Sequence, residues 1–209
     1  MTLARPALAL LVALAAAGTL HAQEGQRPKS FQVRFDEPGP DSGKTSFVTM
    51  TPGWHVTSGL NSGIYYDPSW TATGNYKVET LIHLFDPPKG HAEAYGVFVG
   101  GKDLAGAGES YVYFLLRTDG QFLIKQRTGK TVKEVVPPTP NPAIKPYDAA
   151  AKSVANTITV AAGPETVDFL VNGTKVASRP RKDLPVDGTA GLRINHGLSL
   201  HIAKFGVTK

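Results

Sequence analysis

The sequence predicts an all-β protein, an antiparallel sandwich of two β-sheets, on two observations. Runs rich in Tyr, Val, Phe, Leu and Ile recur about every ten residues along the chain. Dipeptides that tolerate the positive φ angles of hairpin turns separate several of these runs, at Asp119-Gly120, Gly129-Lys130 and Asn172-Gly173. No segment keeps a helical period, and the best helical candidate, Asp148–Val154, is only about two turns long.

The expected strands follow one another evenly from Phe31 to Val207. In chain order they read FQVRFD, SFVTM, WHVTS, GIYYD, NYKVETLIHLF, AYGVFVGG, YVYFLLRT, QFLIKQR, TVKEVV, NTITVAA, TVDFLVN, TKVASR, GLRIN and LSLHIAKFGV. This spacing is typical of a sandwich or barrel. The proline-rich piece PPTPNPAIKP, residues 137–146, lacks the amide donors of a central strand, so we expect it to be a loop that crosses between the sheets.

Alternation of side chains assigns the two faces of two long strands. Between residues 76 and 85, the even-numbered side chains form the expected core face and the odd-numbered ones the outer face. Between residues 111 and 117, the all-apolar set Val112, Phe114 and Leu116 should be buried.

The first 22 residues have the features of a secretory signal peptide. Arg5 supplies the positive charge, an apolar run follows from Ala7 to Ala17, and cleavage is expected after Ala22. The apolar run is shorter than the roughly 20 residues that cross a bilayer. We therefore expect export to the periplasm or the extracellular space, as for a bacterial secreted protein. The mature chain should have no membrane span, a flexible tail over residues 23–30 and one sandwich domain over residues 31–209.

Charge and cysteine content exclude several functions. Removal of Arg5 from 22 basic residues leaves 21 Lys and Arg against 17 Asp and Glu, a net charge of +4. The basic residues are scattered apart from Arg179–Lys182, so no nucleic-acid partner is expected. The chain has no cysteine, which excludes disulfides, thiolate nucleophiles and thiolate metal sites.

A candidate ligand-binding face follows from the alternation. If the two long strands share a sheet, its outer face presents Glu79, His83, Tyr111, Tyr113 and Arg117 together. Aromatic rings stack on the apolar face of a sugar ring, and charged side chains hydrogen-bond its hydroxyls, so this face predicts a carbohydrate partner. The alternative is that the tyrosines cover a half-exposed sheet and the charges pair across strands.

The loop YYDPSWTATG, from Tyr65 to Gly74, is a second candidate for ligand binding. Asp67-Pro68 sets a turn, and Tyr66 and Trp70 flank it as stacking platforms. The alternative is that Trp70 caps the end of the core.

Taken together, these runs resemble the concanavalin A-like jelly rolls. The matching pieces are GWHVTSG, GIYYDPSWTATGNYKVETLIHLF, AYGVFVGGKDLAG, YVYFLLRTDGQFLIKQRTG, NTITVAAGPETVDFLVNGTKVAS and GTAGLRINHGLSLHIAKFGV. The units Asn156–Gly173 and Gly188–Ile194 are the most specific, and both are structural. Within these jelly rolls, the chain looks most like laminin G-like bacterial proteins related to the 3-keto-disaccharide hydrolase family.

The resemblance implies the fold and leaves the function open, because one jelly roll hosts lectins, hydrolases and inert modules. The Glu-x-Asp-x-x-Glu pattern of laminarinase-like enzymes is absent. We therefore expect a non-catalytic carbohydrate-binding module. The alternatives are a hydrolase of a (3-keto-)glycoside or another sugar derivative, with Glu79, His83 and Asp86 as the residues to test, and a structural or adhesive module without a small-molecule ligand.

The sequence predicts no metal or other cofactor. The histidines show no paired-ligand motif, and no acidic cluster resembles the calcium loops that many jelly rolls of this type carry. Glu93 and Glu109 lie in or near loops without an obvious partner, and His196 is expected to be an exposed turn residue.

Overall fold

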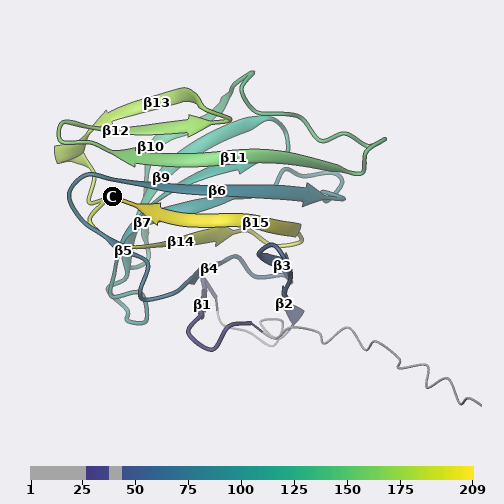
Figure 1. The fold of residues 1–209 in the computed structure, drawn as a ribbon, viewed down its shortest axis with the longest axis horizontal. Coiled ribbons are helices and arrows are strands. Elements are labelled where there is room, and N and C mark those ends of the chain that lie inside the picture. Colours follow the sequence, from purple (N-terminus) through teal and green to yellow (C-terminus); the bar gives the residue numbers. More distant parts are fainter. Residues whose placement is uncertain (1–26, 38–43) are drawn as a thin grey trace, which may run out of the picture.

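The structure is a computed structural model that describes residues 27–37 and 44–209, and it confirms the predicted fold class. Two antiparallel sheets form a β-sandwich (Figure 1). The predicted signal peptide, residues 1–22, lies outside the described residues, as do residues 23–26 of the predicted tail. The remaining part of that tail is a turn, in which the Phe31 amide donates to the Pro28 carbonyl at 2.9 Å. Within the described part of the chain, no helix is long and apolar enough to cross a membrane.

Eight strands form one sheet, in which a short strand, β5, pairs with β14 beside the main path. In spatial order its strands are β1 (Gln32–Phe35), β4 (Gly63–Tyr66), β14 (Gly188–Ile194), β7 (Ala94–Lys102), β8 (Ser110–Arg117), β9 (Gln121–Thr128) and β10 (Thr131–Pro140), with β5 (Thr71–Ala72) alongside.

Seven strands form the other sheet, whose members β12, β11, β6 and β15 lie side by side in Figure 1. In spatial order its strands are β13 (Thr174–Pro180), β12 (Thr166–Val171), β11 (Ser153–Ala162), β6 (Tyr76–Phe85), β15 (Ser199–Thr208), β3 (Trp54–Thr57) and β2 (Ser46–Thr49). A 3-10 helix, Arg181–Asp183, follows β13.

The predicted hairpin turns are present. Gly120 and Gly129 have positive φ angles between β8 and β9 and between β9 and β10. Asn172 and Gly173 both have positive φ, 50° and 82°, in the two-residue turn between β12 and β13. This is the geometry for which Asn-Gly is selected, because both central residues of such a turn must adopt the left-handed region.

The core lies between the two sheets and contains the residues that alternation predicts. All even-numbered side chains of β6 are buried. Val112, Phe114 and Leu116 of β8 are fully buried and belong to the same apolar cluster. The two hydroxyls on the core face of β6 are both paired: Thr80 Oγ1 donates to the Lys204 carbonyl at 2.8 Å, and the Tyr76 hydroxyl donates to the Val186 carbonyl.

The proline-rich segment differs from the prediction. Pro137 and Pro138 lie in β10, not in a loop, and the pairing of β10 with β9 contains two register shifts around them. β10 is an edge strand, where a missing amide donor leaves no neighbour unpaired, so the tolerance of edge strands for proline explains the difference. The helical candidate Asp148–Val154 consists of turns that lead into β11.

Candidate ligand-binding site

The five residues of the predicted binding face lie in different sheets. Glu79 and His83 are on β6 of the seven-stranded sheet, whereas Tyr111, Tyr113 and Arg117 are on β8 of the eight-stranded sheet. The outer faces of a sandwich point away from each other, so these residues do not form one groove. Alternation reports the side of a strand on which a residue lies, but not the sheet that the strand joins.

Tyr111 and Tyr113 do lie on an outer face, but they are not open stacking platforms. Their exposed fractions are only 1% and 8%. They belong to a second apolar cluster outside the core, which we call the outer aromatic cluster and which comprises Ile64, Tyr66, Ala94, Phe98, Leu104, Tyr111, Tyr113, Leu115 and Leu123. Burial raises the pKa of the Tyr111 phenol to about 12, so this group keeps its proton at neutral pH.

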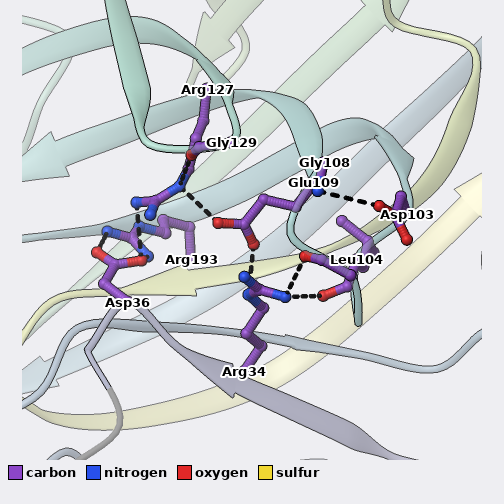
Figure 2. Close-up of polar contacts among 10 residues, drawn as sticks. Arg34, Asp36, Asp103, Leu104, Gly108, Glu109, Arg127, Gly129 and Arg193 are labelled. Carbon is purple, nitrogen blue, oxygen red and sulfur yellow. Dashed lines mark hydrogen bonds and ion pairs between the residues drawn. The ribbon is translucent and has the colours of Figure 1, made fainter.

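Three arginines and two carboxylates join on the same face as the outer aromatic cluster (Figure 2). We call them the arginine–carboxylate cluster: Arg34 of β1, Asp36 just after β1, Glu109 just before β8, Arg127 of β9 and Arg193 of β14. The register explains their convergence, because β1, β4 and β14 are successive neighbours and β8 lies beside β9. Asp36 and Arg193, 157 positions apart in the chain, thereby meet on one surface.

Glu109 joins two of the arginines. Its carboxylate contacts Arg34 Nε at 2.5 Å through Oε2 and Arg127 Nε at 2.8 Å through Oε1, and its side chain is only 3% exposed. Arg34 also donates to the carbonyls of Leu104 and Gly106, which tethers the loop between β7 and β8 to β1. A carboxylate this buried requires such partners, since an unpaired buried charge is strongly destabilising.

Asp36 binds the other side of the cluster. It accepts two hydrogen bonds from Arg193, one of them from Nη1 at 2.7 Å, and one from Arg127 Nη1 at 3.1 Å. Arg193 is 7% exposed and its guanidinium lies 5.6 Å from the centre of the Tyr113 ring, within reach of a cation–π interaction. Burial, the largest single influence, lowers the pKa of Arg193, but the hydrogen bonds to Asp36 together with the nearby Asp36, Tyr111 and Tyr113 outweigh it and raise the pKa above its ordinary value.

Two further features describe the surroundings of Arg193. Its Nε is buried and has no hydrogen-bond partner among the described residues. Gly96 lies directly opposite Arg193 across the strand pair, where a Cβ would come within 2.2 Å of the Phe114 carbonyl oxygen. β7 therefore carries no side chain at this position, because its backbone lies close against β8 there.

Two hollows border the arginine–carboxylate cluster, and Asp36 and Glu37 line both of them. The larger, about 580 Å³, is also lined by Arg127 and Lys130. The smaller, about 220 Å³, is lined on its other sides by Leu60, Asn61, Ser62 and His196. Another hollow, of about 520 Å³, is lined by Arg181, whose guanidinium is already bound to Asp187 and the Gly163 carbonyl. The face beside Asp36 is therefore the better candidate for a ligand site.

The predicted stacking residues of the 65–74 loop are packed inside the protein. Tyr66 is 8% exposed and belongs to the outer aromatic cluster. Trp70 stacks on Phe205 at 4.2 Å between ring centroids and contacts the rings of Phe31 and Trp54. Trp70 thus closes the end of the core, which is the alternative that the sequence left open.

The three residues predicted for a hydrolase each contact a different partner. Glu79 binds Lys204 at 3.0 Å and Lys77 at 3.3 Å, and the hydrogen bond from Lys204 lowers the pKa of its carboxyl. Asp86 accepts a hydrogen bond from the Tyr147 hydroxyl at 3.0 Å. His83 lies beside His201, with 5.8 Å between their ring centroids. A glutamate with a lowered pKa is a poor proton donor at neutral pH.

Arg117 remains on the outer face of the eight-stranded sheet, at the end of β8. It forms a close ion pair with Asp119 in the following turn, at 2.7 Å, and the hydrogen bonds to Asp119 raise the arginine pKa. This local pair occupies its guanidinium.

Sequence reasoning missed the arginine–carboxylate cluster, although one signal was present. Arg34, Arg127 and Arg193 each stand at an outward position in a strand that also carries apolar residues on its core face. That pattern indicates a charged outer face, but it does not reveal the carboxylates. Asp36 and Glu109 lie just beyond strand ends, where alternation no longer assigns a face.

The fold and this site define a β-sandwich jelly roll with a charged, hollowed outer face. No protein-family model matches the sequence, and no curated protein matches it. Solved structures do match the fold. One is the carbohydrate-binding module CBM66 from Bacillus subtilis, with a TM-score of 0.59 and 9% identity over 85% of this chain and 95% of that one.

Two further structures are similar over comparable lengths. The carbohydrate recognition domain of Emp46p, in its metal-free form, has a TM-score of 0.55 and 13% identity over 86% of this chain and 88% of that one. A protein of unknown function with a galectin-like fold from Bacillus subtilis has a TM-score of 0.53 and 11% identity over 88% and 93% of the two chains. At these identities, the likeness establishes a shared fold, the lectin-like jelly roll.

Proposed function

We propose that the protein is an exported, non-catalytic carbohydrate-binding module whose ligand lies against the arginine–carboxylate cluster. One observation carries the proposal. Five charged side chains are gathered on the outer face of a sheet and border two hollows that share Asp36 and Glu37. Two of the structurally similar chains are a carbohydrate-binding module and a carbohydrate recognition domain, which supports a sugar as the ligand class.

The chemistry of the face suits sugar hydroxyls. A hydroxyl both donates and accepts, so it can bridge a carboxylate oxygen and a guanidinium N–H in a single contact. The larger hollow offers both kinds of group, the carboxylates of Asp36 and Glu37 and the cations of Arg127 and Lys130. The ion pairs with Arg193 and Arg127 hold Asp36 in place before a ligand arrives, so little side-chain ordering is left to oppose binding.

A glycan array followed by titration calorimetry tests this function. We expect Asp36→Asn, and separately Lys130→Ala, to weaken binding about 10- to 100-fold, because a hydrogen bond to a charged group contributes about 1.5–3 kcal/mol. Lys130 is exposed, so its removal leaves the fold intact. Lys204→Ala, on the outer face of the other sheet, is the matched control and should leave the affinity unchanged. Binding that none of these variants changes would contradict the proposed site.

The hydrolase alternative rests on the resemblance to the 3-keto-disaccharide hydrolase family. Incubation of the same protein with 3-keto-glycosides separates the two functions. Turnover that Glu79→Gln abolishes would replace the binding function with a hydrolytic one. If the protein shows neither glycan binding nor turnover, the structural or adhesive role becomes the better account. Export is tested by comparing the N-terminus of the secreted protein with the expected cleavage after Ala22.

A further inference from the structure

Two histidines and a glutamate from separate loops meet at one end of the eight-stranded sheet. Glu93 directly precedes β7, and His196 follows β14 in the turn that leads to β15. Because Ile194 pairs with Tyr95 in antiparallel register, the residues just beyond these two strand ends also lie together. His91 precedes Glu93 by two residues and reaches the same point from the loop after β6.

The ligand atoms of these three residues already lie close together. Glu93 Oε1 is 2.9 Å from His196 Nε2 and 3.4 Å from His91 Nε2, and all three atoms lie within 4.8 Å of one another. The two imidazole rings are stacked, with 5.9 Å between centroids and 23° between planes. Metal–ligand bonds of about 2.0–2.2 Å in a tetrahedral site place the ligand atoms about 3.4 Å apart, so only small rotations would admit an ion.

The backbone at two of the three residues, Glu93 and His196, is fixed by other contacts. Glu93 is hydrogen-bonded to Thr118 through its carbonyl at 2.9 Å and its amide at 3.2 Å. On the other side, the buried Ser58 hydroxyl donates to the Asn195 carbonyl and accepts from the Leu198 amide, which holds the turn that carries His196. A site whose ligands are held in this way loses little freedom when an ion binds.

The burial of the three residues indicates which parts of the site are open. The Glu93 side chain is only 7% exposed, whereas those of His91 and His196 are 56% and 42% exposed. His196 also lines the smaller hollow beside Asp36. His196 therefore connects the donor set of two imidazoles and one carboxylate to a hollow, from which water or another ligand would complete the coordination.

We propose that His91, Glu93 and His196 bind one divalent cation of the zinc class. Two nitrogen ligands and one carboxylate suit Zn²⁺ and its neighbours among the transition metals, whereas Ca²⁺ takes six to eight oxygen ligands. This inference departs from the expectation of no metal, which treated His196 as a turn residue without a partner. It does not depend on the proposed sugar-binding function.

The protein contains its own control for non-specific binding by surface histidines. His55, His201 and His83 form a row across β3, β15 and β6 on the outer face of the other sheet. The first and last of these are two strand spacings apart, roughly 9–10 Å, too far to share one ion. Described residues offer three ligand atoms within mutual reach only at His91, Glu93 and His196.

The test is titration calorimetry of the purified full chain without a polyhistidine tag, after treatment with EDTA and its removal. We expect one Zn²⁺ per chain, and a loss of affinity in His91→Ala and His196→Ala beyond the roughly 10- to 100-fold that even an outer-shell change costs. His83→Ala should bind like the unaltered protein. Visible absorption of bound Co²⁺ should show a tetrahedral site that is lost in the same two variants.

Circular dichroism of each variant without metal controls for folding, and His91 is an exposed loop residue whose removal leaves the fold intact. The proposal is overturned by an absence of saturable Zn²⁺ uptake, by uptake that His196→Ala leaves unchanged, or by uptake that His83→Ala abolishes. A preference for Ca²⁺ over Zn²⁺ would overturn the assigned metal class.

Discussion

The two outer faces of the sandwich hold their charged residues in opposite ways. On the eight-stranded sheet, Glu109 and Arg193 are almost fully buried and are linked through Arg127 and Asp36. On the seven-stranded sheet, Glu79 pairs with Lys204, which is 64% exposed, so water surrounds much of that pair. The same residue types therefore form a rigid, desolvated cluster on one side and a solvated surface on the other. Breaking a contact in a desolvated cluster costs more free energy than breaking an exposed one, and its fixed geometry restricts which ligands fit. We therefore place the proposed ligand site on that side.

The largest expected difference between the faces is in stability. Glu109→Ala should lower the free energy of unfolding by about 3–5 kcal/mol, because it leaves Arg34 and Arg127 without their shared buried partner. Glu79→Ala should cost only about 0–1 kcal/mol, as expected for an exposed pair. Urea unfolding of both variants measures this, and equal losses would show that the two faces do not differ in the way described.

A second comparison separates pair energy from the cost of truncation. A double-mutant cycle of Arg193→Leu with Asp36→Ala should give a coupling energy of about 2 kcal/mol, within the 0.5–3 kcal/mol range of contacting residues. The equivalent cycle of Lys204→Ala with Glu79→Ala should give about 0.2–1 kcal/mol. Unfolding free energies of the single and double variants supply both values. A larger coupling at Lys204 would reverse the ranking of the two faces.

The response to alkaline pH should come mostly from the eight-stranded sheet, which holds the buried phenols of Tyr65, Tyr95 and Tyr111, whereas the seven-stranded sheet contributes Tyr76. The pKa of Tyr111 is raised from 10 to about 12 by burial, so between these values the unfolded phenol releases its proton and the folded one keeps it. Stability then falls as pH rises above 10, by about 1.4 kcal/mol per pH unit from this group. Tyr111→Phe should remove this group's share of the slope in a series of unfolding measurements, whereas Tyr65, Tyr76 and Tyr95, whose pKa values burial also raises, should keep theirs. An unchanged slope in the variant would mean that Tyr111 ionises equally in both states.

The smallest expected effect on stability occurs at acidic pH and comes from the outer face of the seven-stranded sheet. Burial, and then the neighbouring His83 and His55, lower the pKa of His201 below 6.5. The unfolded chain therefore takes up the proton first, so stability is present above pH 6.5 and is lost as pH falls through the folded pKa. We expect less than about 1 kcal/mol, because the ring is partly exposed and solvent screens its charge. His201→Gln should reduce the pH dependence of the unfolding free energy between pH 7 and pH 5.

Local rules predicted most of the fold. Asn172-Gly173, the alternation along β6 and the apolar set Val112, Phe114 and Leu116 all behave as the sequence indicates, since each depends on residues within a few positions. The proline-rich segment was predicted wrongly because its structure depends on more than neighbouring residues. Its residues exclude a central strand, but whether a strand lies at an edge depends on the arrangement of the whole sheet.

The candidate sites could not be predicted in the same way. Tyr111 and Tyr113 were placed on an outer face correctly, yet their burial depends on Leu104 and other residues of the outer aromatic cluster from distant parts of the chain. His91 and Glu93 are only two residues apart, but His196 is more than 100 positions away. Only the pairing of β7 with β14 brings it to them.

The sequence alone was sufficient for the strands, their turns, the inward faces and thus the class of fold, because hydrogen-bonding geometry and burial act on neighbouring residues. The tertiary structure decided which strands share a sheet, and through that choice which charges meet. It placed Glu79 and Tyr111 in different sheets, brought Arg34 into contact with Glu109 and brought His196 into contact with Glu93. The reason is physical: long-range register is set by the packing of two whole sheets against one core, and no short segment of the chain contains that information.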